Sequence, residues 1–465
     1  MNELKQNKMG TMPVGKLLFS MAAPMILSML VQALYNVVDS VYIAHYDPNA
    51  LAALTYAFPM QNLLIGSATG MAVGLNAVLS RSLGQGDRDK VNAAATNGVF
   101  MAGVTYAVFL MIGLFLARPF IAMQTDTPEV IEAGAEYLSV VCCFSFGMYI
   151  QIVFERIMQS TGRTIYTLFT QGTGAIINII LDPFFIFSGG DEMFGFSMPF
   201  GLGLGAKGAA IATVIGQIIA AALAVTFNLL KNSDVRFSFR GFRPDGKMIG
   251  RIYSVGIPSM LMMGIGSIMT GGMNIILSRR FSDMAASVFG VYFKLQSFVF
   301  MPAFGLNNGA VPIIAFNWGA GNRKRMLRTV RIAACAVVSY MLLGCLTMQC
   351  FPGTLLRLFR ADESMLAIGI PALRTISLSF LLAGLSVVSI AVFNAMGKGI
   401  YAMLVSMCRQ LVVLLPCAYL FSLSGVVSRV WWSFPLAELM SFALCTVFFI
   451  RLYRSIISKV PEGVS

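Results

Sequence analysis

The sequence predicts an all-α polytopic membrane protein, with twelve transmembrane helices arranged as two six-helix repeats, the N-lobe and the C-lobe, around a central cavity. Three observations lead to this fold class. The chain is 57% hydrophobic and 11% charged, whereas a soluble domain carries about 25% charged residues. Apolar runs of about 20 residues, the length that crosses a bilayer, recur along the whole chain. Motifs of the first half also return in the second half.

The apolar runs predict helices, because the strands of a membrane barrel alternate apolar and polar residues over about ten positions and these runs do not. Pro24, Pro59, Pro258 and Pro302 are expected kink sites, since proline removes one backbone hydrogen bond. The twelve expected spans, in residue numbers, are 17–44, 51–80, 94–116, 137–160, 164–188, 206–230, 252–280, 285–314, 329–351, 367–396, 402–424 and 430–452.

Lysine and arginine gather in the connections on one side of these spans, with clusters in 231–251 and 323–331. Basic connections face the cytoplasm, so we expect both termini inside a multi-pass protein of the cytoplasmic membrane. The expected parts are a cytoplasmic N-terminal segment (1–16), the N-lobe (17–230), a cytoplasmic linker (231–251), the C-lobe (252–452) and a cytoplasmic tail (453–465).

The two halves repeat each other at a nearly constant shift. Gly84-Gln-Gly-Asp-Arg88 returns as Gly319-Ala-Gly-Asn-Arg323, and Pro24 corresponds to Pro258. Gly74 and Gly134 likewise correspond to Gly309 and Gly369. Each half holds an even number of spans, so both halves have the same topology and are related by an axis along the membrane normal, as in transporters with parallel repeats.

Several functional classes are disfavoured. The net charge of +13 is explained by topology, so no nucleic-acid partner is expected. The eight cysteines form no C-x-x-C pair and there is one histidine, which argues against a metal centre or a disulfide framework. No Walker motif is present, which argues against an ATP-driven pump. No nucleophile–base pair is visible, so we expect neither an enzyme nor a cofactor.

Two aspartates lie inside apolar runs of the first half: Asp39 in the first expected span and Asp182 in the fifth. An aspartate at a helix centre in a bilayer costs roughly 2.5–3.5 kcal/mol, which makes it a functional hypothesis by default. Asn178 lies one helical turn from Asp182, and Thr213 of the sixth span reaches a similar depth, although either alone could be satisfied by an ordinary interhelical hydrogen bond. Two carboxylates close together in a poorly solvated site cannot both ionise cheaply, so the pair can hold a proton, or bind a sodium ion with oxygens of Asn178 and Thr213.

Other charged residues allow more than one interpretation. Glu155 and Arg156 lie near the cytoplasmic end of the fourth span, where an interfacial pair is slightly favoured over a role in cation recognition. Glu438 has no obvious partner in sequence. Three basic residues lie in spans of the second half, where they could balance Glu438 or line a cavity: Lys294, Arg374 and Arg409.

These features together resemble the multidrug and toxic compound extrusion (MATE) family over essentially the whole chain. Besides the two repeats, the resemblance rests on motifs that are weak singly and specific in this order: Pro24…Gln32…Asp39, Gly84-Gln-Gly, Gln159-Ser-Thr-Gly162, Asn178…Leu-Asp-Pro183 and Gly208-Ala-Ala-x-Ala-Thr213.

The resemblance implies a secondary antiporter that exports organic cations and drugs in exchange for protons or sodium ions by alternating access. It places the coupling-ion site at Asp39, Asn178, Asp182 and Thr213, and makes Pro24 a hinge of the first span. Glu155 resembles an acidic position in part of the family, and Gln32 and Tyr35 are further candidates for substrate binding or coupling. We expect a monomer in the lipid bilayer.

One family feature is missing. Some members carry acidic residues in spans 7 and 10, but here span 7 has no acid and span 10 has only Arg374. A lipid-linked precursor flippase of the same architecture remains the alternative, and its anionic headgroup would use the three basic residues of the second half.

Overall fold

The computed structural model describes residues 7–46, 48–193, 196–237, 242–359 and 361–462. Parts of the expected terminal segments and Arg240 of the basic linker lie outside these ranges. Among the described residues, ten helices are long and apolar enough to cross a membrane, and two further helix pairs, each bent at a break, bring the number of spans to twelve. The predicted all-helical membrane architecture is confirmed.

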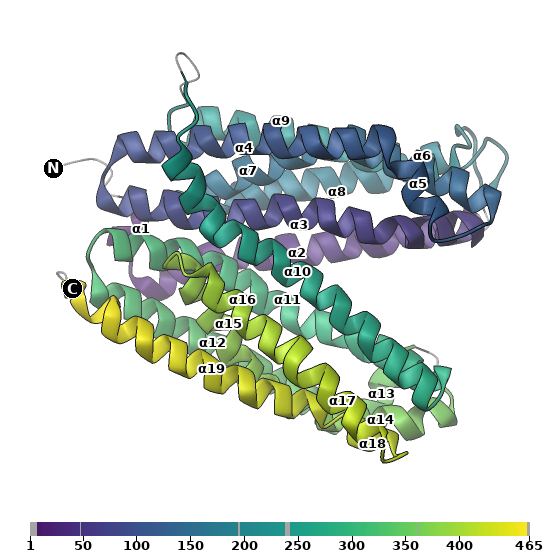
Figure 1. The fold of residues 1–465 in the computed structure, drawn as a ribbon. Coiled ribbons are helices and arrows are strands. Elements are labelled where there is room, and N and C mark those ends of the chain that lie inside the picture. The colour runs from purple at the N-terminus through teal and green to yellow at the C-terminus, as the bar shows by residue number, and fades with distance from the viewer. Residues whose placement is uncertain (1–6, 47, 194–195, 238–241, 360, 463–465) are drawn as a thin grey trace. The chain divides into compact units, whose positions relative to one another are not determined.

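The first half of the chain begins with a short helix, α1, and then forms six spans, with α6 and α7 taken as one bent span; Figure 1 shows their arrangement. A two-residue hairpin, β1–β2, lies between the fifth and sixth of them. The elements are α1 (Lys8–Thr11), α2 (Val14–Tyr46), α3 (Pro48–Gln85), α4 (Arg88–Phe115), α5 (Ala117–Ala122), α6 (Pro128–Cys143), α7 (Phe146–Ser160), α8 (Thr164–Ile186), β1 (Glu192–Met193), β2 (Phe196–Ser197) and α9 (Gly205–Lys231).

The second half repeats this order of long, short and bent helices. Its eleventh span contains a π-helical segment, η2, between two α-helical parts. The elements are α10 (Gly246–Arg280), α11 (Asp283–Gly319), α12 (Arg323–Cys350), α13 (Pro352–Arg357), α14 (Glu363–Ser377), α15 (Phe380–Ala395), α16 (Gly399–Met407), η2 (Cys408–Leu414), α17 (Leu415–Ser422), α18 (Val427–Val430), α19 (Ser433–Ser455) and a 3-10 helix, η3 (Ile457–Lys459).

The fourth and tenth spans are each two helices rather than one. The bend is 45° between α6 and α7 and 50° between α14 and α15. At each break a serine hydroxyl bonds the carbonyl three residues back, Ser145 to Cys142 at 2.8 Å and Ser379 to Ile376 at 2.7 Å. These side chains compete with the helical backbone ladder. The four prolines expected to mark kinks lie inside continuous helices.

Glycines explain why the turn before α4 and the turn before α12 share a sequence. Gly86 has φ +74° and Gly321 has φ +70°, a conformation that side chains with a Cβ rarely adopt. The next residue caps the following helix in both turns, Asp87 accepting from Lys90 N at 3.1 Å and Asn322 from Arg325 N at 3.0 Å. The hydrogen bond from the Lys90 side chain also holds the pKa of Asp87 below its usual value.

The chain forms two compact units, residues 27–83 with 87–256 (the N-unit), and residues 1–26 with 84–86 and 257–465 (the C-unit). Helix α2 therefore begins in the C-unit and continues in the N-unit after Ile26, two residues beyond Pro24. Helix α10 changes unit next to Pro258 in the corresponding way.

Glycines allow two close helix crossings, one within each unit. Within the C-unit, Gly309 of α11 lies against the backbone of Ala22 in α2, and within the N-unit, Gly74 of α3 lies against the backbone of Ile252 in α10. A Cβ at either glycine would collide with backbone atoms of the neighbouring helix. Small residues allow such close approach between membrane helices, which explains why the repeat keeps glycine at both positions.

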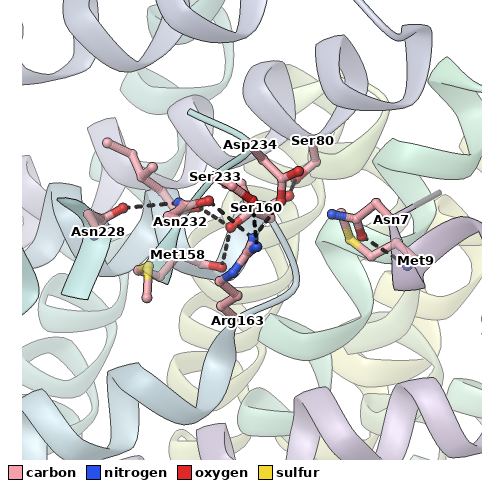
Figure 2. Close-up of polar contacts among 12 residues, drawn as sticks. Asn7, Met9, Ser80, Met158, Ser160, Arg163, Asn228, Asn232, Ser233 and Asp234 are labelled. Atoms are coloured by element: carbon pink, nitrogen blue, oxygen red, sulfur yellow. Dashed lines mark hydrogen bonds and ion pairs between the residues drawn. The ribbon is translucent and has the colours of Figure 1, made fainter. Parts of the chain in front are cut away.

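Arg163 fastens the connection between α7 and α8 to the end of α9 in the N-unit (Figure 2). Its guanidinium donates to Asn232 at 3.1 Å and to the carboxylate of Asp234. Asn232 in turn donates to Asn228 at 3.1 Å. Arginine suits this position because its planar fork can donate to several acceptors at once.

Candidate functional site

The candidate site begins at the contact between α8 and α9, which pack closely because glycines face each other there. Gly174 of α8 and Gly216 of α9 are so close that a Cβ on either would contact the backbone of the other helix. One turn further along α8, Asn178 is brought within reach of Thr213 on α9, and its amide donates to the Thr213 hydroxyl at 3.2 Å. The same amide donates to Asp182 at 3.1 Å.

Asp182 and Asn178 are both buried, with 0% and 3% of their surface exposed. They lie four residues apart on α8, so they share one face of the helix. The structure therefore brings together three of the four residues predicted to bind the coupling ion, Asn178, Asp182 and Thr213.

The fourth residue, Asp39 of α2, lies within electrostatic range of Asp182. Tyr35, one turn before Asp39, interacts electrostatically with both carboxylates and forms a hydrogen bond with Gln32. The Gln32 side chain is otherwise exposed. All these residues belong to the N-unit.

Three side-chain oxygens of this group are buried and have no hydrogen-bond partner among the described residues: Oδ1 of Asp39, Oδ1 of Asn178 and Oδ2 of Asp182. A buried polar atom without a partner costs about 1–3 kcal/mol, and more if it is charged. Because all three atoms are acceptors, a proton or a small cation would satisfy them. Unlike a fully satisfied structural network, this arrangement leaves acceptors for which no described residue supplies a donor.

The sequence interpretation missed two neighbours of this site, Tyr137 of α6 and Gln61 of α3. The Tyr137 hydroxyl donates to the Gln61 side-chain oxygen at 3.4 Å, and Tyr137 interacts electrostatically with Asp39, Tyr35 and Asp182. The signal in the sequence is slight, since a tyrosine in an apolar run is usually a packing residue. Gln61 is the stronger signal of a buried polar site, because an amide inside a membrane span needs a hydrogen-bond partner.

Glu155 of α7 forms a separate buried site, with 3% of its surface exposed. Its carboxylate accepts hydrogen bonds from Gln151 at 3.0 Å, Thr170 at 2.7 Å and Gln171 at 2.8 Å. The neighbouring Arg156 donates to Gln159 at 3.0 Å and also interacts electrostatically with Glu155. The hydrogen bonds to Glu155 thus come from neutral donors of α7 and α8, and none of them comes from the residues around Asp39 and Asp182.

In the C-unit, Glu438 has a partner that the sequence did not reveal. Arg409 of η2 donates to Glu438 Oε1 of α19 at 2.8 Å. Arg374 donates to the backbone oxygen of Gln349 at 3.3 Å, and the Lys294 side chain is exposed. Two of the three basic residues of the second half are therefore engaged by neighbours, which gives the flippase alternative no added support.

Two six-span repeats, with an unsatisfied carboxylate site inside one of them, are the architecture of a secondary transporter. A family model confirms the class and the repeat, because the MatE model matches residues 24–184 and again residues 258–420. The chain belongs to the MatE family of membrane transporters.

Curated relatives and solved structures agree with this assignment. The chain is 24% identical over 431 residues to the multidrug export protein MepA of Staphylococcus haemolyticus, covering 91% of each chain. It is 24% identical over 451 residues to MepA of Staphylococcus aureus strain MRSA252, covering 95% of this chain and 94% of MepA.

Among solved structures, the crystal structure of MATE in the straight conformation matches with a TM-score of 0.89 at 22% identity, covering 98% of this chain and 99% of the other. The outward-facing conformation of a multidrug resistance MATE family transporter of the MOP superfamily matches with a TM-score of 0.86 at 22% identity, covering 97% and 99%. At this identity the likeness establishes the fold.

Proposed function

We propose that the protein is an antiporter that exports organic cations across the cytoplasmic membrane in exchange for protons or sodium ions. The observation that carries the proposal is the set of three buried, unpartnered oxygens on Asp39, Asn178 and Asp182. The curated relatives are named multidrug export proteins, which supports drugs as the substrates, and the resemblance of the motifs to the MATE family implies organic cations among them. The protein acts as a monomer with both termini in the cytoplasm.

Coupling follows from the charge that the site gains and loses. With the site empty, two carboxylates lie within electrostatic range of each other in a poorly solvated region, which is costly. A proton or sodium ion that enters from outside removes part of this repulsion and satisfies the free oxygens. Asp39 lies on α2, which is shared by the two units. Binding of an ion at the site therefore changes the forces on α2. Pro24 is the hinge at which α2 bends in response.

The driving force is sufficient for export. One pH unit is worth about 1.4 kcal/mol, and a membrane potential of about 100 mV adds about 2.3 kcal/mol for each charge moved. Exchange also requires that binding of the coupling ion change the affinity for the substrate. Coupling free energies of this kind are typically about 1–3 kcal/mol.

The test is transport of a fluorescent lipophilic cation into proteoliposomes, with a proton gradient and a sodium gradient imposed separately. The wild-type protein should respond to at least one gradient, and that gradient identifies the coupling ion. Asp39→Asn and Asp182→Asn should each abolish gradient-driven transport while the protein still inserts in the membrane. Glu363→Gln is the matched control, because Glu363 is 92% exposed and lies in the other unit. Gradient-driven transport that survives in both aspartate variants refutes the coupling proposal.

A further inference from the structure

The ion pair of Arg409 and Glu438 is the feature of the C-unit that the proposed coupling site does not explain. The side chains are 25% and 12% exposed, and their charged atoms lie 2.8 Å apart. A buried ion pair is weak evidence for stability, since apolar residues of similar volume often serve as well. An ionisable residue inside a membrane span is therefore a functional hypothesis, here with its partner identified.

The ion pair engages only one of the two carboxylate oxygens of Glu438. Arg409 satisfies Oε1 of Glu438, whereas Oε2 is buried and has no hydrogen-bond partner among the residues that the structure describes. The carboxylate thus has room for a second positive partner. The 12% of the Glu438 side chain that is exposed does not include Oε2, so a cation reaches this oxygen only when the surrounding side chains move.

The backbone around Arg409 is unusual. Residues Cys408–Leu414 form a π-helix, the one such segment within the described ranges, and Leu415 N donates to Gln410 O. Pro416 follows at once and cannot donate a backbone hydrogen bond. Such π-helical turns occur frequently at functional sites, which makes this part of the eleventh span a candidate site.

Aromatic rings lie beside the pair. Tyr292 of α11 interacts electrostatically with both Glu438 and Arg409. Its ring meets that of Phe434, one turn before Glu438 on α19, edge to face at a centroid distance of 5.6 Å. The two rings are buried, with 1% and 7% of their surface exposed, so they surround the pair with apolar surface, where the attraction between a carboxylate and a cation is stronger than in water.

The two halves of the chain use corresponding helices differently. In the N-unit the fifth and sixth spans are linked by Asn178 and Thr213, and Asp39 and Asp182 share no basic partner in the described part of that site. In the C-unit the corresponding spans are linked by an arginine and a glutamate. In the C-unit, Arg409 is therefore a cation that belongs to the chain itself and lies beside an acidic residue.

We propose that Glu438 binds the positive group of the exported organic cation and that Arg409 is a tethered competitor which limits the affinity. This inference rests on the proposed function and adds a recognition site in the C-unit to it. The substrate cation approaches the free Oε2 while Arg409 holds Oε1. The competition keeps binding weak enough for the substrate to leave, as transport requires.

The experiment measures binding rather than transport, so it does not depend on the coupling site. Tetraphenylphosphonium, whose charge is permanent, is titrated into the purified full-length protein at one pH without any gradient. Glu438→Gln should weaken its binding about tenfold, equivalent to about 1.4 kcal/mol. Arg409→Gln should instead tighten binding by a similar factor, because it frees the carboxylate. The double variant should bind as weakly as Glu438→Gln, because Arg409 acts only through Glu438.

A purely structural ion pair predicts something else, since loss of either partner would then change binding in the same direction. Glu438→Asp keeps the charge and should bind more tightly than Glu438→Gln, which keeps the inference testable should Arg409→Gln not fold. Triphenylphosphine oxide, a neutral probe, should bind wild type and Glu438→Gln alike. Glu363→Gln, which removes an exposed charge from the same unit, should leave the affinity for tetraphenylphosphonium unchanged.

Two outcomes overturn the inference. If wild type binds tetraphenylphosphonium and Glu438→Gln binds it equally well, Glu438 is not a recognition site, while the proposed antiport stands. If wild type binds no organic cation, the substrate class of the proposed function falls and this inference falls with it.

Discussion

Replacing Gly309 tests whether α2 is held in the C-unit by close backbone contact. A Cβ at Gly309 would lie 2.9 Å from the Ala22 Cα and 3.1 Å from the Met21 carbonyl carbon, whereas non-bonded carbons prefer about 3.5–4.0 Å. The two helices must therefore move apart by several tenths of an ångström. Such overpacking typically costs about 1–3 kcal/mol.

The matched control is Gly290 on the same helix, α11, where a Cβ would meet nothing within 4 Å. Alanine stabilises a helix relative to glycine by up to about 1 kcal/mol. Gly290→Ala should therefore keep or raise the midpoint of thermal unfolding of the purified protein. Gly309→Ala gains the same helix propensity but should lower the midpoint, because the collision costs more than the propensity supplies.

Gly309→Val should lower the midpoint further, since it adds two methyl groups at the same contact. The thermal midpoint is measured in detergent, with all variants at the same protein concentration. Equal shifts for Gly290→Ala and Gly309→Ala would refute the reasoning, because they would show that the helix crossing tolerates a side chain at Gly309.

Two further predictions concern the N-unit. Arg163→Met should lower the free energy of unfolding by about 1.5–3 kcal/mol, the value of a hydrogen bond to a charged group, because it removes the bonds to Asn232 and Asp234. Arg163→Lys should lie between wild type and Arg163→Met in the same thermal assay, and a methionine variant as stable as wild type contradicts this. Thr213→Val removes the hydroxyl that accepts from Asn178 at nearly constant volume, so gradient-driven export should fall several-fold while Thr213→Ser stays close to wild type. Equal losses in the serine and valine variants would argue against a role for the hydroxyl.

The sequence alone determined the membrane architecture of this protein. In a bilayer only helices and closed barrels satisfy every backbone polar group, and the apolar runs of this chain do not alternate as barrel strands do, so they predict helices. A charged side chain inside an apolar run is costly in a bilayer, which is why Asp39 and Asp182 could be selected without a structure. The repeat was visible because turn glycines such as Gly86 and Gly321, both with positive φ, leave a backbone requirement in the sequence.

The tertiary structure decided which side chains meet. Arg409 and Glu438 are 29 residues apart and lie on different spans, so no local pattern joins them. At the bend after Cys142, the Ser145 hydroxyl donates to the Cys142 carbonyl. A serine hydroxyl can compete in this way with the backbone hydrogen bonds of a helix or leave them intact, and the sequence does not distinguish these outcomes. The unpartnered state of Asp39, Asn178 and Asp182 likewise depends on every helix packed around them. Hydropathy and periodicity are properties of contiguous residues, whereas the pairing of polar groups follows from where helices cross, and in this chain close contacts at glycines such as Gly174 and Gly309 set those crossings.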